Sequence, residues 1–181
     1  MDALAALPWP NVRGKRCLGI APDHLALRRE LEARGARTVE TSAAADALAV
    51  LGDAEPYDVI VAGSVLASAH EPLSVAHALH AATRGVLVSW EPIDLDLSLA
   101  GRGRALYTLH DDGRAGTLGF NGAGQRRLLE LASFAIERAS KPFVVEGDVA
   151  LSTLRRVALR AITGRGEVGQ LHRALLARPL G

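Results

Sequence analysis

The sequence has few of the residues that mark several common classes of protein. Its single cysteine, Cys17, excludes an intramolecular disulfide and a cysteine-based zinc site. Aromatic residues make up only 4% of the chain, which argues against recognition of single-stranded nucleic acid by base stacking. No apolar run approaches the ~18 residues of a membrane span, and Asp2 lies where a signal peptide would carry basic residues. We therefore expect a cytoplasmic protein without a membrane span.

The chain as a whole also lacks a large net charge of either sign, although its charges are unevenly distributed. The net charge of +1 does not indicate a globally basic nucleic-acid-binding protein. Residues 148–181 carry six arginines against two acids, a charge of +4, so residues 1–147 carry −3. We expect an α/β domain over 1–147 and a basic, helical C-terminal extension over 148–181 that packs on the same domain.

Short apolar segments alternate with helical ones along the first half of the chain, as in a doubly wound α/β protein. The pattern predicts strands at 15–21, 36–40, 58–62 and 85–90, and helices at 23–35, 43–51 and 71–82. Residues 94–120 are expected to form an inserted loop or hairpin, and 122–133 a helix. Two strands at 134–139 and 142–146 are expected to pair as a hairpin, before helices at 149–163 and 167–177.

The clearest of these elements is the strand–helix–strand segment of residues 57–92. Its two strands are separated by one helix within about 35 residues, which predicts a parallel βαβ unit. Ligands bind beyond the carboxyl ends of the strands in such sheets. The residues Gly63–Ser68 and Trp90–Asp94 are therefore expected to line a binding site.

The same segment resembles a known family. The string YDVIVAGSVL, an EPL that begins a helix, and a later TRGVLV are similar to the middle of class I S-adenosylmethionine (SAM) methyltransferases. The text is closest to small methyltransferases related to tRNA wobble-uridine modifying enzymes, and the downstream LGFNGAGQRRLLELASF resembles a third block of that group. The resemblance implies a Rossmann-like, mostly parallel sheet of the class I methyltransferase type, shortened by about one strand and closed by a terminal antiparallel hairpin.

The resemblance also implies which residues would bind SAM. The matching positions around the first strand and its turn are Gly19, Ile20, Ala21 and Asp23, the second strand supplies Glu40 for the ribose hydroxyls, and the turn after the third predicted strand supplies Gly63, Ser64 and Val65. The chain departs from the family pattern here. Gly19 replaces the acid of the family's first motif, Ala21 replaces its first glycine, and Pro22 removes a backbone N–H from the turn.

Two functions stay open from the sequence. The first is a SAM-dependent methyltransferase that acts on a small molecule or on RNA. The second is a degenerate methyltransferase fold that acts as a binding or assembly partner, with a protein partner or self-association through the basic C-terminal helices. A receiver-type signalling domain is disfavoured because Gly63 stands where the phosphorylated aspartate would be. His77 and His80 have helical metal-ligand spacing, but no matching ligand pair is evident, so no metal is expected.

Overall fold

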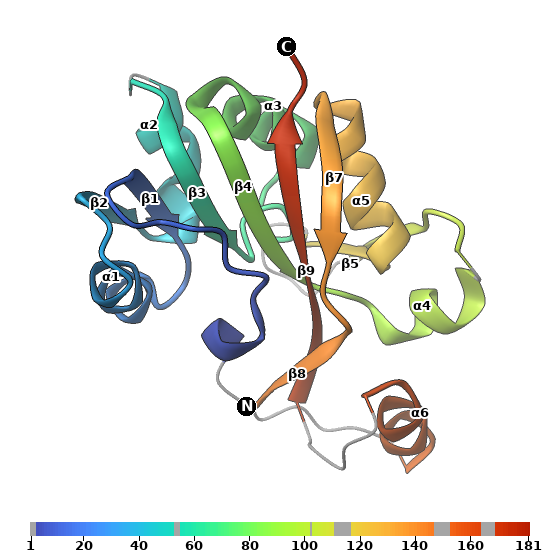
Figure 1. The fold of residues 1–181 in the computed structure, drawn as a ribbon. Helices are drawn as coiled ribbons and strands as arrows, with labels where there is room; N and C mark the ends of the chain where they lie inside the picture. Colours follow the sequence, from blue (N-terminus) through green and yellow to red (C-terminus); the bar gives the residue numbers. More distant parts are fainter. Residues whose placement is uncertain (1–2, 53–54, 102, 111–116, 147–152, 164–168) are drawn as a thin grey trace.

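The computed structural model describes residues 3–52, 55–101, 103–110, 117–146, 153–163 and 169–181. A central sheet has the strand order β2-β1-β3-β4-β9-β7, with β8 also paired to β9 (Figure 1). Its first four strands, β1 (Arg16–Ile20), β2 (Thr38–Ser42), β3 (Tyr57–Gly63) and β4 (Thr83–Pro92), are mutually parallel. The predicted alternation of strands and helices is confirmed for this part of the chain.

Helices cover both faces of the sheet. One face packs against α2 (Ala47–Gly52), α3 (Pro72–Ala82) and α5 (Gly122–Leu131), around a core that includes Leu18, Ile60 and Leu129. The other face is covered by α1 (His24–Ala33) and by the N-terminal segment with its 3-10 helix η1 (Ala3–Ala6), which contacts the strand β8 (Phe143–Glu146). A second short 3-10 helix, η2 (Ala44–Asp46), precedes α2.

Residues 94–120 hold α4 (Leu95–Gly101) and a separate two-stranded hairpin of β5 (Tyr107–His110) and β6 (Thr117–Phe120). The hairpin expected in this segment is therefore confirmed. Farther along, α6 (Thr153–Thr163) follows β8. None of the helices in the described parts of the chain is long and apolar enough to cross a membrane.

The helix predicted over residues 167–177 is wrong. The segment forms β9 (Gly169–Pro179), which lies between β4 and β7 and is antiparallel to both. Seven of its eleven residues are buried because the strand is covered on both faces. A strand buried on both faces has a continuous apolar sequence, and Leu171, Ala174 and Leu175 happen to follow the spacing of a helix stripe.

The two strands predicted near residue 140 exist, but their pairing with each other is wrong. β7 (Phe134–Ala139) and β8 run along the same strand, β9, one after the other. Ser140 keeps the chain on that edge, since its N–H donates to the Ala174 carbonyl at 2.8 Å and its Oγ accepts the Ala174 N–H at 3.0 Å. The antiparallel pairing at one end of the sheet is therefore that of β7 with β9. At the other end β2 is the edge strand, in agreement with the prediction of a sheet shortened by about one strand.

Candidate functional site

A cavity opens where the sheet changes its direction of winding. β1 and β3 are neighbours, yet the chain proceeds from β1 to β2 on one side and from β3 to β4 on the other. Doubly wound sheets bind ligands at such a switch point, beyond the carboxyl ends of the strands. The cavity there, called the first cavity, has a volume of about 350 Å³. Its lining residues are Ala3, Leu4, Ala21, Pro22, Asp23, Ala26, Ser64, Trp90, Val145 and His172.

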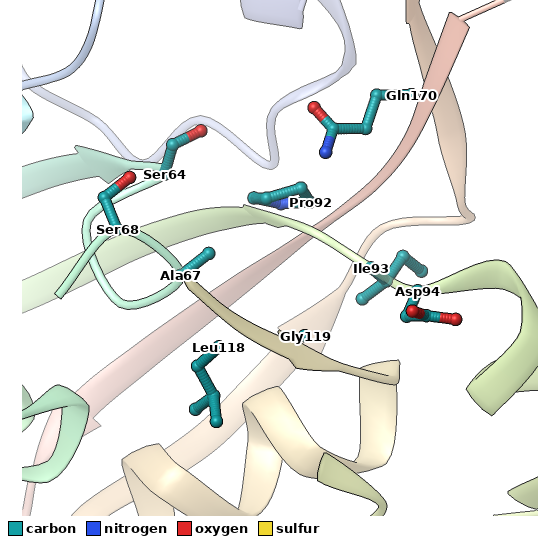
Figure 2. Close-up of a pocket in the computed structure, with 9 residues that line it drawn as sticks. All are labelled: Ser64, Ala67, Ser68, Pro92, Ile93, Asp94, Leu118, Gly119 and Gln170. Atoms are coloured by element: carbon teal, nitrogen blue, oxygen red, sulfur yellow. The ribbon is translucent and has the colours of Figure 1, made fainter. Parts of the chain in front are cut away.

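A second cavity, of about 290 Å³, adjoins the first at Ser64. Figure 2 shows Ser64 and Ser68 on the loop after β3, Pro92 at the end of β4 with Ile93 and Asp94 after it, and Gln170 on β9. The remaining lining residues are Ala67, Leu118 and Gly119. The segments 63–68 and 90–94, predicted to line a site, therefore both contribute to these cavities.

The turn at Gly63 and Ser64 combines an uncommon backbone conformation with a close contact to a side chain. Ser64 has a φ of 57°, in the left-handed region that non-glycine residues rarely adopt. Its N–H donates to the Trp90 carbonyl at 2.9 Å. The Trp90 indole ring lies against the Gly63 backbone so closely that a Cβ atom on Gly63 would overlap the ring. Strained backbone of this kind is concentrated at functional sites, where the surrounding structure enforces it.

Glu91 holds the loop that follows Ser64. This residue of β4 is fully buried, and its carboxyl group accepts three backbone N–H groups: Val65 and Leu66 at Oε1, and Ala67 at Oε2, each at 3.1 Å. Burial raises the pKa of Glu91 to about 8, against the lowering effect of these hydrogen bonds. A single side chain thus fixes the loop that follows Ser64, the residue that both cavities share.

This titration predicts a pH dependence of stability. The folded pKa of Glu91 lies above its unfolded value, so its contribution is complete below about pH 4.5 and is lost as the pH rises through about 8. Burial lowers the pKa of His172 to about 4. The titration of His172 therefore changes the free energy of unfolding only at pH values below its ordinary pKa of 6.5. Between pH 6.5 and 8 we expect the free energy of unfolding to fall by up to about 1.4 kcal/mol per pH unit. Urea unfolding of the native protein at several pH values in this range should show this fall in the free energy of unfolding. A Glu91→Gln variant with the same pH dependence would contradict its assignment to Glu91.

His172 brings an uncharged imidazole to the first cavity. It lies on β9, is 5% exposed, and stacks on Phe143 with 6.0 Å between the ring centroids. Its Nδ1 atom is buried without a hydrogen-bond partner among the described residues. Since burial lowers the pKa of His172 to about 4, the ring stays neutral at physiological pH.

Comparison with known proteins identifies the fold. No protein-family model and no curated protein matches the sequence. Solved structures match almost the whole chain. A SAM-dependent methyltransferase from Listeria monocytogenes, described as putative, has a TM-score of 0.60 at 10% identity, over 96% of this chain and 93% of that one. The chain has the fold of SAM-dependent methyltransferases.

Two further structures with the methyltransferase fold differ in what they contain. One is a Burkholderia thailandensis 1,6-didemethyltoxoflavin-N1-methyltransferase with bound 1,6-didemethyltoxoflavin and S-adenosylhomocysteine, at TM-score 0.61 and 14% identity over 93% of this chain and 72% of that one. The other is a putative methyltransferase in complex with the Trm112 methyltransferase activator of Haloferax volcanii. Its TM-score is 0.56 at 12% identity, over 99% of this chain and 88% of that one. At these identities the comparison establishes the fold.

The eight predicted SAM-binding residues do not all lie together in this methyltransferase fold. Ala21, Asp23 and Ser64 line the first cavity. Asp23 also caps α1, because its Oδ1 accepts the Ala26 N–H at 2.9 Å. The other strand and turn positions, Gly19, Ile20, Gly63 and Val65, do not line the first or the second cavity, and Gly63 acts by leaving room for the Trp90 ring.

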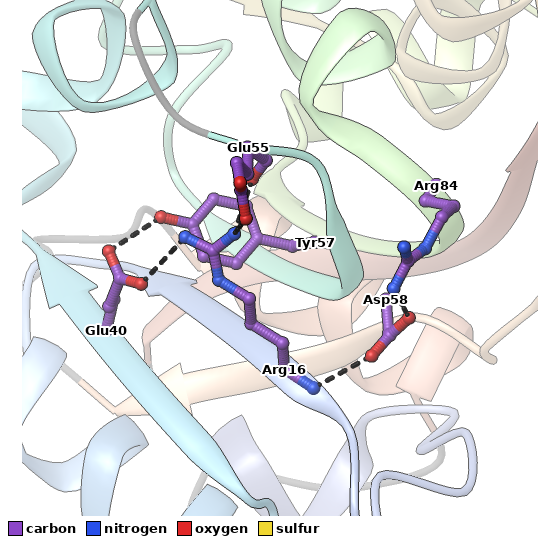
Figure 3. A network of polar contacts seen from close by, with 6 residues as sticks. All are labelled: Arg16, Glu40, Glu55, Tyr57, Asp58 and Arg84. Carbon is purple, nitrogen blue, oxygen red and sulfur yellow. Dashed lines mark hydrogen bonds and ion pairs between the residues drawn. The ribbon is translucent and has the colours of Figure 1, made fainter.

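Glu40 lies away from both cavities. Its carboxylate accepts the Tyr57 hydroxyl at 2.7 Å and Arg16 Nη2 at 3.1 Å (Figure 3). The hydrogen bond from Tyr57 is the main cause that lowers the pKa of Glu40. Arg16 and Tyr57 are the first residues of β1 and β3, so they hold Glu40, the middle residue of β2, from the amino ends of the neighbouring strands, away from the cavities. In this structure the carboxylate stabilises the sheet.

Sequence reasoning placed Glu91 within the predicted site segment 90–94 but missed its role, and it missed His172 altogether. The signal for Glu91 was present, as an acidic residue inside the otherwise apolar stretch GVLVSWEP. Buried charged residues are rare unless they have partners, so an acid in a core strand indicates a specific role. His172 was hidden by the incorrect helix over 167–177, which gave no reason to place it beside β4.

Proposed function

We propose that the protein binds SAM in the first cavity and transfers its methyl group to a small molecule in the second. The observation that supports this proposal is that the two cavities share Ser64 at the switch point of a methyltransferase fold. Methyl transfer is mainly a matter of holding donor and acceptor close and in line. When bound, SAM supplies an electrophilic methyl group on a sulfonium cation, and the protein needs only to position the two partners.

The residues of the first cavity suit such a cation. Trp90 offers an aromatic ring, and aromatic rings attract cations through the negative face of the π system. Asp23 has one carboxylate oxygen in the α1 cap and a second without a partner among the described residues. Burial keeps His172 uncharged, so this imidazole does not repel a positive ligand. The volume of about 350 Å³ lies within the usual range of small-molecule sites.

A second candidate function is a methyltransferase fold that serves as a binding or assembly partner without catalysis. Three observations favour it: Glu40 is committed to Arg16 and Tyr57, Pro22 has no N–H to offer a ligand, and the sheet ends at β2. The neighbour in complex with an activator supports a protein partner in general terms. The basic 148–181 segment as its contact, an RNA acceptor, and the relation to tRNA wobble-uridine modifying enzymes all stay predictions.

Titration calorimetry with SAM and with S-adenosylhomocysteine separates the two functions. We expect binding by the native protein and a loss of at least about tenfold in affinity for Ala26→Leu, because the larger side chain fills the first cavity from α1. Ala33→Leu is the matched control, since Ala33 is an exposed residue of the same helix, and it should bind as the native protein does. Absence of binding by the native protein at millimolar ligand would reject the catalytic function in favour of the binding partner.

A further inference from the structure

Arg173 is a cation without a counterion among the described residues. It lies on β9 directly across from Glu91 on β4, but the Glu91 carboxyl is held by the loop 65–67. No acid in the described parts of the chain forms an ion pair with Arg173, and its Nε atom is buried without a hydrogen-bond partner. Buried charges in proteins are normally paired, so a partly buried guanidinium whose Nε atom has no partner is a candidate anion-binding group.

The surroundings of Arg173 are themselves positive. Its guanidinium lies against Gly122, the first residue of α5, where a Cβ atom would come within 2.6 Å of Nη1. The amino end of a helix carries a partial positive charge and free N–H groups. Among these, Gly124 N–H is taken by the Asn121 side chain at 2.8 Å, while those of Gly122 and Ala123 have no acceptor among the described residues. Burial lowers the pKa of Arg173, and the charge of Arg126 adds to this effect.

A third cavity provides the space for an anion. Its volume is about 200 Å³, and its lining includes Ser98, Asn121, Gly122, Ala123, Pro142 and Arg173. Asn121 shapes its rim, because its Nδ2 donates to the Arg104 carbonyl at 2.8 Å and its Oδ1 accepts the Leu106 N–H at 3.2 Å. Ile93 lines both this cavity and the second one, so the third cavity continues the series that begins at Ser64.

We propose that Arg173 and the first turn of α5 bind the oxyanion, a carboxylate or a phosphate, of a small-molecule methyl acceptor. A guanidinium binds two oxygens of either group at once, and the N–H groups of a helix terminus bind a third oxygen of a phosphate or share one oxygen of a carboxylate. The place of this group in an acceptor rests on the proposed function. The oxyanion site itself does not, because it needs no SAM.

The test uses inorganic phosphate and acetate, titrated into the SAM-free protein at constant ionic strength set with chloride. We expect one of the two anions to bind and to raise the melting temperature, and the tighter one identifies the class of oxyanion. Arg173→Met should weaken that binding by at least about tenfold, as expected for loss of a charge-assisted hydrogen-bond pair. Arg178→Met is the control, since Arg178 is an exposed residue of the same strand that pairs with Glu137.

A purely structural arginine would behave differently. If Arg173 only supported the fold, Arg173→Met would lower the melting temperature in chloride, whereas we expect it to stay unchanged or rise once an unpaired charge is removed. No binding of either anion by the native protein overturns the proposal, as does unchanged binding by Arg173→Met. Failure of SAM to bind the first cavity would instead reject only the proposed function, which is measured in a separate titration.

Discussion

Replacement of Glu91 by alanine is expected to lower the free energy of unfolding by about 3–5 kcal/mol, the largest effect of any single substitution considered for this chain. The reason is that the carboxyl group accepts the N–H groups of Val65, Leu66 and Ala67 in a fully buried position. Alanine would leave three buried donors without an acceptor and a void beside them. Each orphaned donor costs about 1–3 kcal/mol, reduced where water can enter.

Urea denaturation at pH 6.5 measures this effect. Glu137→Ala is the control, because Glu137 lies on the exposed part of β7 and its ion pair with Arg178 is on the surface. Such a pair contributes at most about 1 kcal/mol. A Glu91→Ala protein that unfolds within 1 kcal/mol of the native protein would show that the loop 65–67 does not depend on this side chain.

Gly63→Ala is expected to destabilise the protein by about 3 kcal/mol, because the added methyl group would overlap the Trp90 indole ring. The residue is 5% exposed, belongs to the same buried cluster as Val61 and Val88, and lines the first cavity, so we expect the displaced ring to move into that open space. We therefore expect a weaker affinity for SAM as well as a lower melting temperature.

Gly52→Ala provides the matched control for this substitution. Gly52 ends α2, and a Cβ atom there would meet nothing within 4 Å. Alanine at such a position should be neutral or stabilising by up to about 1 kcal/mol. Equal stability of the Gly63→Ala, Gly52→Ala and native proteins would mean that the indole ring does not occupy the position that makes Gly63 necessary.

The parallel half of the sheet could be predicted from sequence because each of its elements has a local signal. Tyr57–Gly63 is a short apolar run ended by a turn, and Asp23 precedes an apolar stripe as a helix cap does. β9 has no such signal. A strand inserted between two others is apolar on both faces, and its neighbours, β4 and β7, are distant in sequence. Local periodicity cannot separate it from a helix.

The candidate site was predictable only to the level of its segments. The rule for parallel sheets located the turns at 63–68 and 90–94 without any knowledge of side-chain contacts. The role of Glu40 could not be inferred in the same way, because it depends on Tyr57 and Arg16 reaching the carboxylate from two other strands. The unpaired state of Arg173 likewise follows from tertiary packing around α5, which no sequence spacing encodes.

The central claim is that the cavity at the β1/β3 switch point binds SAM, and amide nuclear magnetic resonance tests it most directly. Titration with S-adenosylhomocysteine should shift the amide signals of Asp23, Ala26 and Ser64, which line the first cavity. The amides of Asp58 and Arg84, at the opposite end of the strands, should stay in place. Shifts confined to the amino-end residues, or none at saturating ligand, would contradict the claim.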